Sequence, residues 1–225
     1  MITHGPSLVT NGLITFYDFN SLRSYVSGTG ITDISGSGNA GTFSGATTVS
    51  SGYASFAGTT NITTASNFNN PQVFSVSIWF NTTSTTGKKL FGFESNQTGT
   101  ASTSYDRMFV VDTTGSLYWG WNTGTNQTFS YGNINTGAWF NAIVTFNSGT
   151  QVYYLNGSQV GSNAGSAAQN YSGYWRIGGY KSTGWSNSSD GYFTGNVGPV
   201  LVYNRILSAT EVAQNFNAHR GRYSI

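Results

Sequence analysis

The sequence predicts an all-β protein, built as a two-sheet antiparallel sandwich with one short C-terminal helix. Short segments in which apolar and polar residues alternate recur along the chain, and turns rich in Gly, Asn and Ser separate them. Aromatic residues make up 16% of the 225 residues, which is ample for a buried core, whereas charged residues make up only 7%. The polar surface must therefore consist of Ser, Thr, Asn, Gln and Gly, a composition that favours strands and turns.

The expected strands run from residue 13 to residue 203 without a linker or an internal repeat, which indicates a single domain. The segment 138–146 is the most apolar, and we expect it at the centre of a sheet. Asn156 and Gly157 give the strongest hairpin signal, because both tolerate positive φ in a two-residue turn between 152–155 and 158–160. The other expected strands are 13–19, 53–56, 61–64, 73–80, 89–94, 107–112, 116–121, 174–178 and 193–203.

One convincing helix is predicted, over residues 207–219. Ser208 and Glu211 match the S-x-x-E capping box, in which each side chain bonds the backbone amide of the other residue. Leu207 and Val212 stand at the positions of a hydrophobic staple. The apolar stripe that should dock the helix consists of Ala209, Val212, Ala213 and Phe216.

Gly221 is expected to end this helix and to leave a tail of residues 220–225, while residues 1–11 form an N-terminal arm. His219, Arg220 and Arg222 stand close together in a chain that has only nine Lys and Arg residues. We expect these three residues to contact a neighbouring subunit in a homo-oligomer or a larger assembly.

Composition argues against several classes of function. The net charge of +2 rests on few charged residues and leaves no basic stripe for phosphates, so nucleic-acid binding is not expected. The chain has no cysteine, so disulfides and thiolate metal sites are excluded. No apolar run approaches the ~20 residues of a membrane span, and we expect no membrane insertion. The N-terminus does not match a signal peptide, which predicts synthesis in the cytoplasm.

Four blocks of the sequence resemble the laminin-G-like, concanavalin A-like jelly-roll domain. They are residues 12–19, the D-x-S-G-x-G-N-x-G-T loop at 33–42, Trp139 to Asn141 with the hairpin at 154–157, and 195–205 with the helix that follows. The resemblance covers nearly the whole chain. It implies a concanavalin A-like jelly roll as the fold class and one such domain over residues 1–225.

A narrower resemblance concerns residues 5–13, the loop that begins at Asp33, and residues 215–222. Together they are similar to virion structural proteins of tailed bacteriophages. This resemblance implies a non-enzymatic capsid decoration or tail/fibre subunit on the virion surface, with other virion proteins as partners and surface glycan binding as a second role. The first alternative is a carbohydrate-binding host-recognition adhesin, and the second is a glycoside hydrolase.

Hydrolysis of a glycosidic bond usually needs two carboxylates about 5–10 Å apart. Glucan hydrolases with this fold would carry an E-x-D-x-x-E run on one strand, and none of the seven acidic residues forms such a run. Glu211 is already assigned to the helix cap, and the two histidines, His4 and His219, lie near opposite ends of the chain. We therefore expect no enzymatic activity and no catalytic residue.

The Gly-, Ser- and Asn-rich segment 179–192 fits a sugar site, because such sites present aromatic faces and amide or carboxylate groups on loops. Trp185 is a candidate for an exposed platform; the alternative, which we favour, is that it folds over the core or into a subunit contact. Trp79, Trp119, Trp121 and Trp139 are assigned to the core, and Trp175 is left undecided. The candidate glycan-binding residues are Tyr180, Trp185, Asn187, Asp190 and Tyr192.

No cofactor is expected. Several relatives bind calcium at the sandwich rim, and Ca²⁺ prefers six to eight oxygen ligands that include carboxylates. Asp18 and Asp33 are weak calcium candidates, because residues 56–58 read Phe-Ala-Gly where the family often has Phe-Asp-Gly. The alternative, which we favour, is that Asp18 and Asp33 order their own loops.

Overall fold

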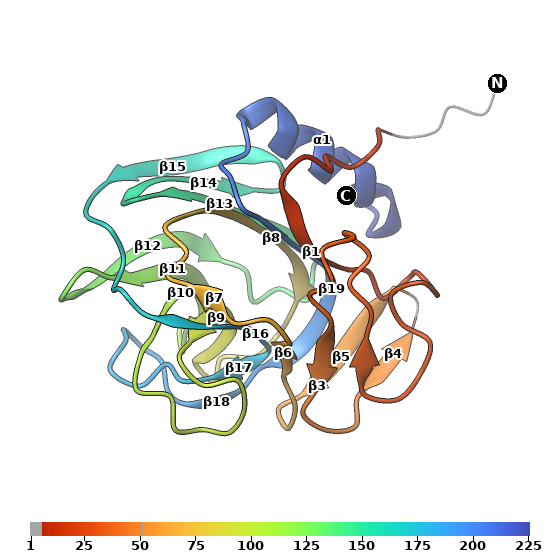
Figure 1. Cartoon of the computed structure of the whole chain (residues 1–225), viewed down its shortest axis with the longest axis horizontal. Helices are drawn as coiled ribbons and strands as arrows, with labels where there is room; N and C mark the ends of the chain where they lie inside the picture. Colours follow the sequence, from red (N-terminus) through yellow and green to blue (C-terminus); the bar gives the residue numbers. More distant parts are fainter. Residues whose placement is uncertain (1–5, 51) are drawn as a thin grey trace.

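Two antiparallel sheets face each other in the computed structural model, which describes residues 6–50 and 52–225 (Figure 1). The first five residues of the predicted N-terminal arm, His4 among them, lie outside the described residues. Within these described residues one sheet has eight strands and the other has nine, so the predicted all-β sandwich is confirmed.

The eight-stranded sheet carries the helix. Its order is β15 (Ser158–Ala164), β14 (Thr150–Leu155), β13 (Phe140–Asn147), β8 (Val73–Asn81), β19 (Thr194–Tyr203), β5 (Tyr53–Ala57) and β4 (Thr48–Ser50), with β1 (Leu13–Tyr17) paired to β19.

The nine-stranded sheet faces it. Its order is β12 (Asn126–Asn133), β11 (Ser116–Asn122), β10 (Tyr105–Val111), β9 (Lys88–Glu94), β16 (Ser172–Ile177), β6 (Ile62–Thr64), β3 (Gly41–Phe43) and β2 (Gly30–Ile31), with β7 (Phe68–Asn69) paired to β16. A separate two-stranded ribbon joins β17 (Gly179–Tyr180) to β18 (Gly191–Tyr192).

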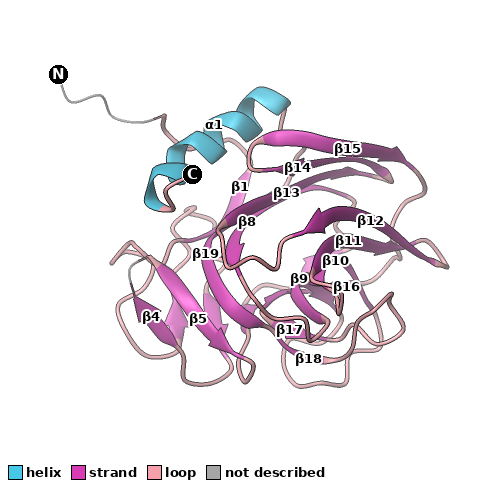
Figure 2. Ribbon diagram, turned by 180° about the vertical axis from the view of Figure 1, so that it is seen from behind, coloured by secondary structure: helices cyan, strands magenta, loops and turns pink. Residues whose placement is uncertain are grey.

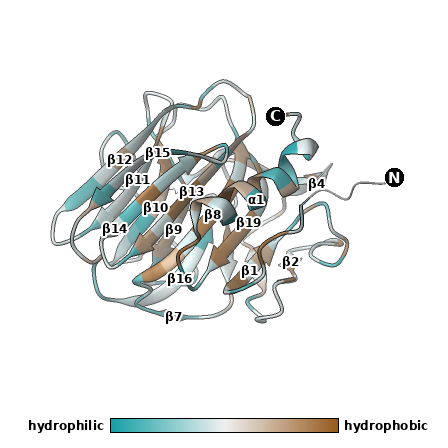
Figure 3. Cartoon of the chain, turned by 90° about the horizontal axis from the view of Figure 1, so that it is seen from above, coloured by the Kyte–Doolittle hydropathy of each residue, from teal (hydrophilic) through white to brown (hydrophobic). Residues whose placement is uncertain are grey.

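The core between the sheets is rich in aromatic residues. Trp119, Trp121 and Trp175 are at most 1% exposed and belong to this core, as predicted for the first two. Trp79 is equally buried, but it packs against the helix on the other face of its sheet. Trp139 is only half-buried and lies beside Tyr223, so its assignment to the core is wrong. Figure 3 shows hydrophobic residues concentrated on β1 and β19 beneath the helix.

The closing helix, α1 (Ala209–His219), lies on the outer face of the eight-stranded sheet (Figure 2). Its capping box is confirmed, since Ser208 and Glu211 each bond the backbone amide of the other. Leu207 and Val212 are both buried in the cluster beneath the helix, as the staple predicts. The helix is too short to cross a membrane, and no other described helix is long and apolar enough to do so.

The buried face of α1 differs in part from the predicted stripe. Asn215 and His219 are buried, whereas Ala209 is exposed. Gly221 does not end the helix: α1 continues into a 3-10 turn, Arg220–Arg222, and Gly221 does not adopt a left-handed φ.

Polar side chains of the helix hold the N-terminal arm. The Val9 amide donates to Asn215 Oδ1 at 2.9 Å, and the Tyr203 hydroxyl donates to the Val9 carbonyl, also at 2.9 Å. Asn215 Nδ2 in turn donates to the Tyr203 hydroxyl. The side-chain amide of Asn215 therefore occupies a buried position of the helix where an apolar side chain would be expected. It does so because the arm brings backbone groups that need hydrogen-bond partners.

Candidate functional site

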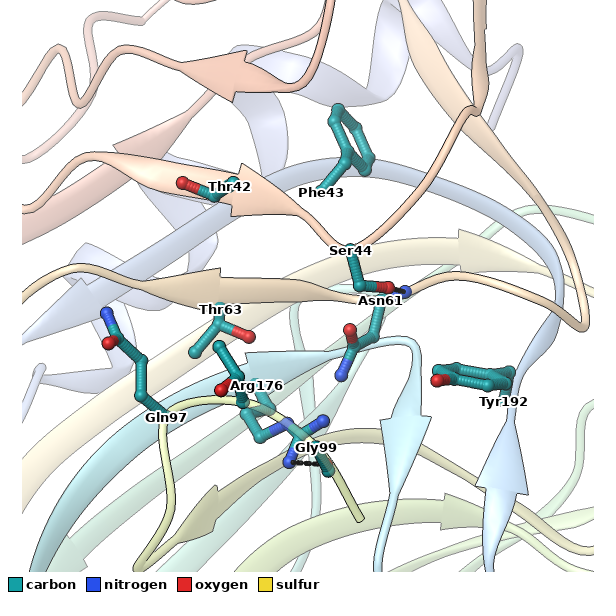
Figure 4. A pocket seen from close by; sticks show the side chains of 10 residues that line it. Thr42, Phe43, Ser44, Asn61, Thr63, Gln97, Gly99, Arg176 and Tyr192 are labelled. Carbon is teal, nitrogen blue, oxygen red and sulfur yellow. Dashed lines mark hydrogen bonds between the residues drawn. The ribbon is translucent and has the colours of Figure 1, made fainter.

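A cavity of about 290 Å³ opens on the outer face of the nine-stranded sheet, and we call it the outer cavity (Figure 4). Strands β3, β6 and β16 form its floor, the loop after β9 forms one wall, and β18 forms another. Phe43 points away from it into the core, because neighbouring residues of a strand face opposite sides of the sheet. The lining residues are Thr42, Phe43, Ser44, Asn61, Thr63, Gln97, Thr98, Gly99, Arg176 and Tyr192.

Arg176 lies at the centre of the outer cavity, and its neighbours hold the guanidinium in place. Its NH1 group donates to the Gly99 carbonyl at 2.9 Å and to Glu94 Oε2 at 2.9 Å. The Asn61 amide is oriented by the groups around it, with its oxygen towards Arg176 and its nitrogen towards Ser44. In this orientation Asn61 accepts from Arg176 Nε at 3.0 Å and from NH2 at 2.6 Å.

Glu94 lies beneath the outer cavity and is fully buried. Its carboxylate pairs with Arg176 and with Lys89, and Ser102 Oγ donates to it at 2.6 Å. The amides of Tyr180 and Lys181 donate to Glu94 Oε1 at 3.2 and 3.0 Å. One carboxylate therefore orients the arginine of the cavity and also ties the loop after β16 to the sheet.

Burial changes the protonation of the two cations beside Glu94. It lowers the pKa of Arg176 to about 10, so the guanidinium remains charged at neutral pH. Burial, and then the repulsion from Arg176, lowers the pKa of Lys89 well below its usual value. Glu94 has two basic partners, and Arg176 is the one that keeps its charge more firmly. The Arg176–Glu94 ion pair is therefore the more persistent of the two under the cavity.

The five predicted glycan residues lie on one loop, residues 178–193, but they do not form one surface. Tyr192 lines the outer cavity, and the ring of Tyr180 meets its ring edge-on at 5.5 Å. Both rings are half-buried. Of the five, Tyr192 alone lies among the residues that line this cavity.

Asp190 stabilises the loop. Its carboxylate accepts from Lys181 Nζ at 2.7 Å and from the amides of Ser182 and Thr183, each at 2.9 Å. Partial burial raises the pKa of Asp190, but the hydrogen bonds from Lys181 and the two amides outweigh this effect and lower the pKa to about 2. These contacts occupy the carboxylate and give it a structural role.

Trp185 is 6% exposed, so it is not an exposed platform, and the favoured alternative of a residue folded onto the protein is correct. The indole packs on the outer face of the nine-stranded sheet with Met108, Val110 and Tyr118. Gly120 makes this contact possible: a Cβ on Gly120 would lie 2.6 Å from Trp185 Cζ3. Asn187 is exposed, and its carbonyl accepts from the Thr113 amide.

The predicted assembly residues are mostly engaged within the chain. His219 is 2% exposed and packs between Phe16 and Trp79, so it is not available to a neighbouring subunit. Arg222 pairs with Asp18 at 2.9 Å, whereas Arg220 is exposed. Contacts within the chain therefore hold His219 and Arg222, and the predicted role of Arg220 in a subunit contact stays a prediction.

The two calcium candidates already accept hydrogen bonds from the protein. Asp18 accepts from Arg222 NH1 with both oxygens, at 2.9 Å each, and from the Asn20 amide at 3.0 Å. These contacts order the loops around the two carboxylates. The Asp33 carboxylate accepts from the amides of Phe16, Ser35 and Asn39 and from the Ser35 hydroxyl.

Sequence reasoning missed most of the residues that line the outer cavity, Arg176 and Asn61 among them. One signal for Arg176 was present. It lies between Trp175 and Ile177 in a predicted strand, so alternation places it on the face opposite the core. A charged residue within an apolar strand of a weakly charged protein marks a functional or structural position.

The two-sheet sandwich with a polar cavity on one outer face places the protein among lectin-like β-sandwiches. The sequence profile of the Laminin G 3 family, which belongs to the concanavalin A-like lectin/glucanases superfamily, matches residues 56–213. The protein therefore belongs to this family. A search of curated proteins finds no match.

Solved structures share the fold at low sequence identity. Trypanosoma rangeli sialidase in complex with sialic acid has a TM-score of 0.70 and 12% identity, over 95% of this chain and 34% of the sialidase. Domain 4 of an extracellular arabinanase from Geobacillus stearothermophilus, in complex with arabinotriose, has a TM-score of 0.59 and 15% identity, over 96% of this chain and 100% of that domain.

Botulinum neurotoxin type C, which interacts with two ganglioside molecules, has a TM-score of 0.69 and 13% identity, over 93% of this chain and 52% of the toxin chain. The protein thus spans about a third of the length of the sialidases that it matches. At these identities the similarity shows the fold alone.

Proposed function

We propose that the protein is a non-enzymatic carbohydrate-binding protein and that it binds sugar in the outer cavity. One observation carries the proposal: hydroxyl, amide and guanidinium groups converge there beside the ring of Tyr192. Sugars present hydroxyl groups that both donate and accept, together with an apolar ring face, and this combination of side chains matches both features.

The structural relatives support the ligand class. The arabinanase domain was solved with arabinotriose, and the neurotoxin interacts with gangliosides. The charge of Arg176 is balanced by Glu94, so the cavity has no strong preference for an anion. A neutral glycan segment therefore fits the outer cavity best.

The arrangement of acids supports binding without hydrolysis. Glu94 lies under the floor with its oxygens bound to protein donors, and the described residues that line the outer cavity include neither Asp nor Glu. A mechanism with two carboxylates on either side of a glycosidic bond has no acid and no nucleophile there.

Replacement of Tyr192 by Ala is expected to weaken glycan binding at least tenfold. Among the described lining residues only Phe43 and Tyr192 are aromatic, and Phe43 faces the core, so the variant has no aromatic ring to contact a sugar. Loss of one well-placed contact of about 1.4 kcal/mol corresponds to this factor. The measurement is a glycan array followed by calorimetric titration with the best ligand.

The matched control is Tyr53→Ala, which removes another half-buried tyrosine from the opposite sheet. It should bind like the parent protein. The proposal fails if the parent binds no glycan, or if Tyr192→Ala binds as tightly as Tyr53→Ala.

A second proposal concerns the setting of the protein. We infer from the sequence resemblance that the protein is a structural subunit on the surface of a bacteriophage particle, where the glycan site would contact the host or its surroundings. An exposed apolar pair favours a subunit contact: Leu22 is 81% exposed and Val26 is 75% exposed. Surface of this kind is usually covered in an assembly when several such residues lie together.

A virion role predicts that the protein is present in many copies in purified particles of the phage that encodes it. Quantitative mass spectrometry of such particles measures the copy number relative to the major capsid protein. Absence from the particles would contradict the virion role and would leave the adhesin as the remaining interpretation.

A further inference from the structure

A second cavity of about 290 Å³ lies between the two sheets at one end of the sandwich, and we call it the inter-sheet cavity. Figures 1 and 2 both show the β11–β12 hairpin and the end of β15 on this side of the molecule. One wall comes from the hairpin of the nine-stranded sheet, and the other comes from the end of β15 in the eight-stranded sheet. Its lining residues are Trp121, Thr123, Gln127, Asn163, Ala164, Gly165 and Ser166.

The inter-sheet cavity borders a buried donor that has no acceptor. Trp121 is 1% exposed, and its Nε1 group has no hydrogen-bond partner among the described residues. The adjoining edge of the indole faces the cavity wall, since a Cβ on Gly165 would lie 3.9 Å from Trp121 Cζ2. A buried N–H without an acceptor costs about 1–3 kcal/mol, so an oxygen at this position would be bound favourably.

A second unpartnered donor lies nearby. Gln151 is fully buried, and its Nε2 group also lacks a partner among the described residues. Its Oε1 accepts from the Tyr153 hydroxyl at 3.1 Å. Gln151 stands opposite Asn163 in the β14–β15 pair, and Asn163 lines the cavity. Two buried donors without acceptors therefore lie at the same end of the sandwich.

We propose that the inter-sheet cavity is a binding site for one uncharged sugar residue, separate from the outer cavity. The described residues that line it bear hydroxyl, amide and indole groups and no charge. An anionic ligand would find no cation in this wall, whereas a sugar hydroxyl accepts from the indole and donates to the amide oxygens. Trp121 supplies the donor that selects an oxygen at the inner end of the site.

The test follows the Trp121 indole N–H by ¹H–¹⁵N NMR during titration with glucose, galactose, N-acetylglucosamine and arabinose, with glucuronate as the anionic probe. The chain has six tryptophans, so the Trp121 signal is assigned by its loss in Trp121→Phe. At least one neutral sugar should shift this signal in a saturable manner, and glucuronate should not.

Two variants distinguish a bound sugar from a general change in the core. Trp119→Phe is the matched control, because Trp119 is equally buried and its Nε1 also lacks a partner, yet it does not line the inter-sheet cavity. It should keep the sugar-dependent shift of Trp121. Gly165→Val fills the cavity from its exposed wall and should weaken binding at least tenfold.

Gly165→Val is expected to fold, since an added Cβ would meet only ordinary contacts, at 3.7 Å from the Gly149 oxygen and 3.9 Å from Trp121. Tyr192→Ala should leave the sugar-dependent shift of Trp121 unchanged. The experiment therefore distinguishes a wrong proposal for the outer cavity from a wrong proposal for the inter-sheet cavity. The proposal is overturned if no neutral sugar shifts the Trp121 signal, or if Gly165→Val binds like the parent.

Discussion

Replacement of Glu94 by Gln is expected to lower the free energy of unfolding by about 3–5 kcal/mol, which is the usual cost of removing one partner from a buried ion pair. Glu94, Lys89 and Arg176 are all at most 1% exposed, so solvent compensates only partly for the lost carboxylate. Lys89 can release its proton, because burial has already lowered its pKa. Arg176 cannot do so at neutral pH, and its charge therefore accounts for most of the loss.

Urea unfolding followed by circular dichroism measures this difference. Glu211→Gln is the matched control, because Glu211 pairs with Arg205 at 2.6 Å on the surface and Gln retains the capping interaction. The control should lose less than about 1 kcal/mol, as exposed ion pairs do. A loss below that limit in Glu94→Gln would show that the buried cluster does not need its carboxylate.

Acidification from pH 7 to about pH 4 is expected to destabilise the protein by about 3 kcal/mol through His219 alone. Burial, and then the nearby Arg222, lowers the pKa of His219 from 6.5 to about 4. Below pH 6.5 the unfolded chain takes up a proton that the folded protein does not bind. Stability is therefore complete above pH 6.5 and decreases as the pH falls towards 4.

Two charged groups face His219, and they act on its pKa in opposite directions. Asp18 favours the protonated imidazole and Arg222 opposes it, and the two form an ion pair. The lowered pKa of Glu211, about 2, affects stability only below its ordinary value of 4.5. The contribution of His219 between pH 6.5 and 4.5 is therefore isolated by comparison with a variant that lacks the imidazole.

His219→Phe supplies the comparison, because a phenyl ring can occupy the site between Phe16 and Trp79 without binding a proton. The variant should lose much less stability than the parent over the same interval. Urea unfolding at several pH values gives both slopes. Equal slopes for the parent and His219→Phe would rule out His219 as the cause.

Local signals were sufficient to predict much of the fold. The capping box of Ser208 and Glu211 and the Asn156–Gly157 hairpin depend on residues that are close in sequence, and both are observed. Strand β12 was missed because Phe129 and Tyr131 are its only large apolar residues, and most of its other side chains are exposed. An edge strand of this kind has a weak apolar pattern.

The site was harder to predict than the fold for a geometric reason. Asn61 and Arg176 are 115 residues apart, and they meet only because β16 pairs with β6. Alternation shows which face of a strand a residue occupies, but it does not show which strand lies beside it. The place where Trp185 packs could not be predicted, because the space it fills is created by Gly120, a residue far away in the sequence.

In the 178–193 loop, the groups that hold the loop against the protein are different from the groups that are exposed on its surface. Glu94 and Asp190 hold its backbone, and Trp185 fastens it to the sheet, all through groups that face inward. The stretch between Trp185 and Asp190 includes the exposed residues Ser186 and Asn187. A change of the Ser186 side chain leaves the inward contacts intact, whereas Asn187 has a φ of 47°, which favours Asn, Asp or Gly there. The surface of the loop can therefore diversify in evolution at Ser186 while the sandwich beneath it stays the same.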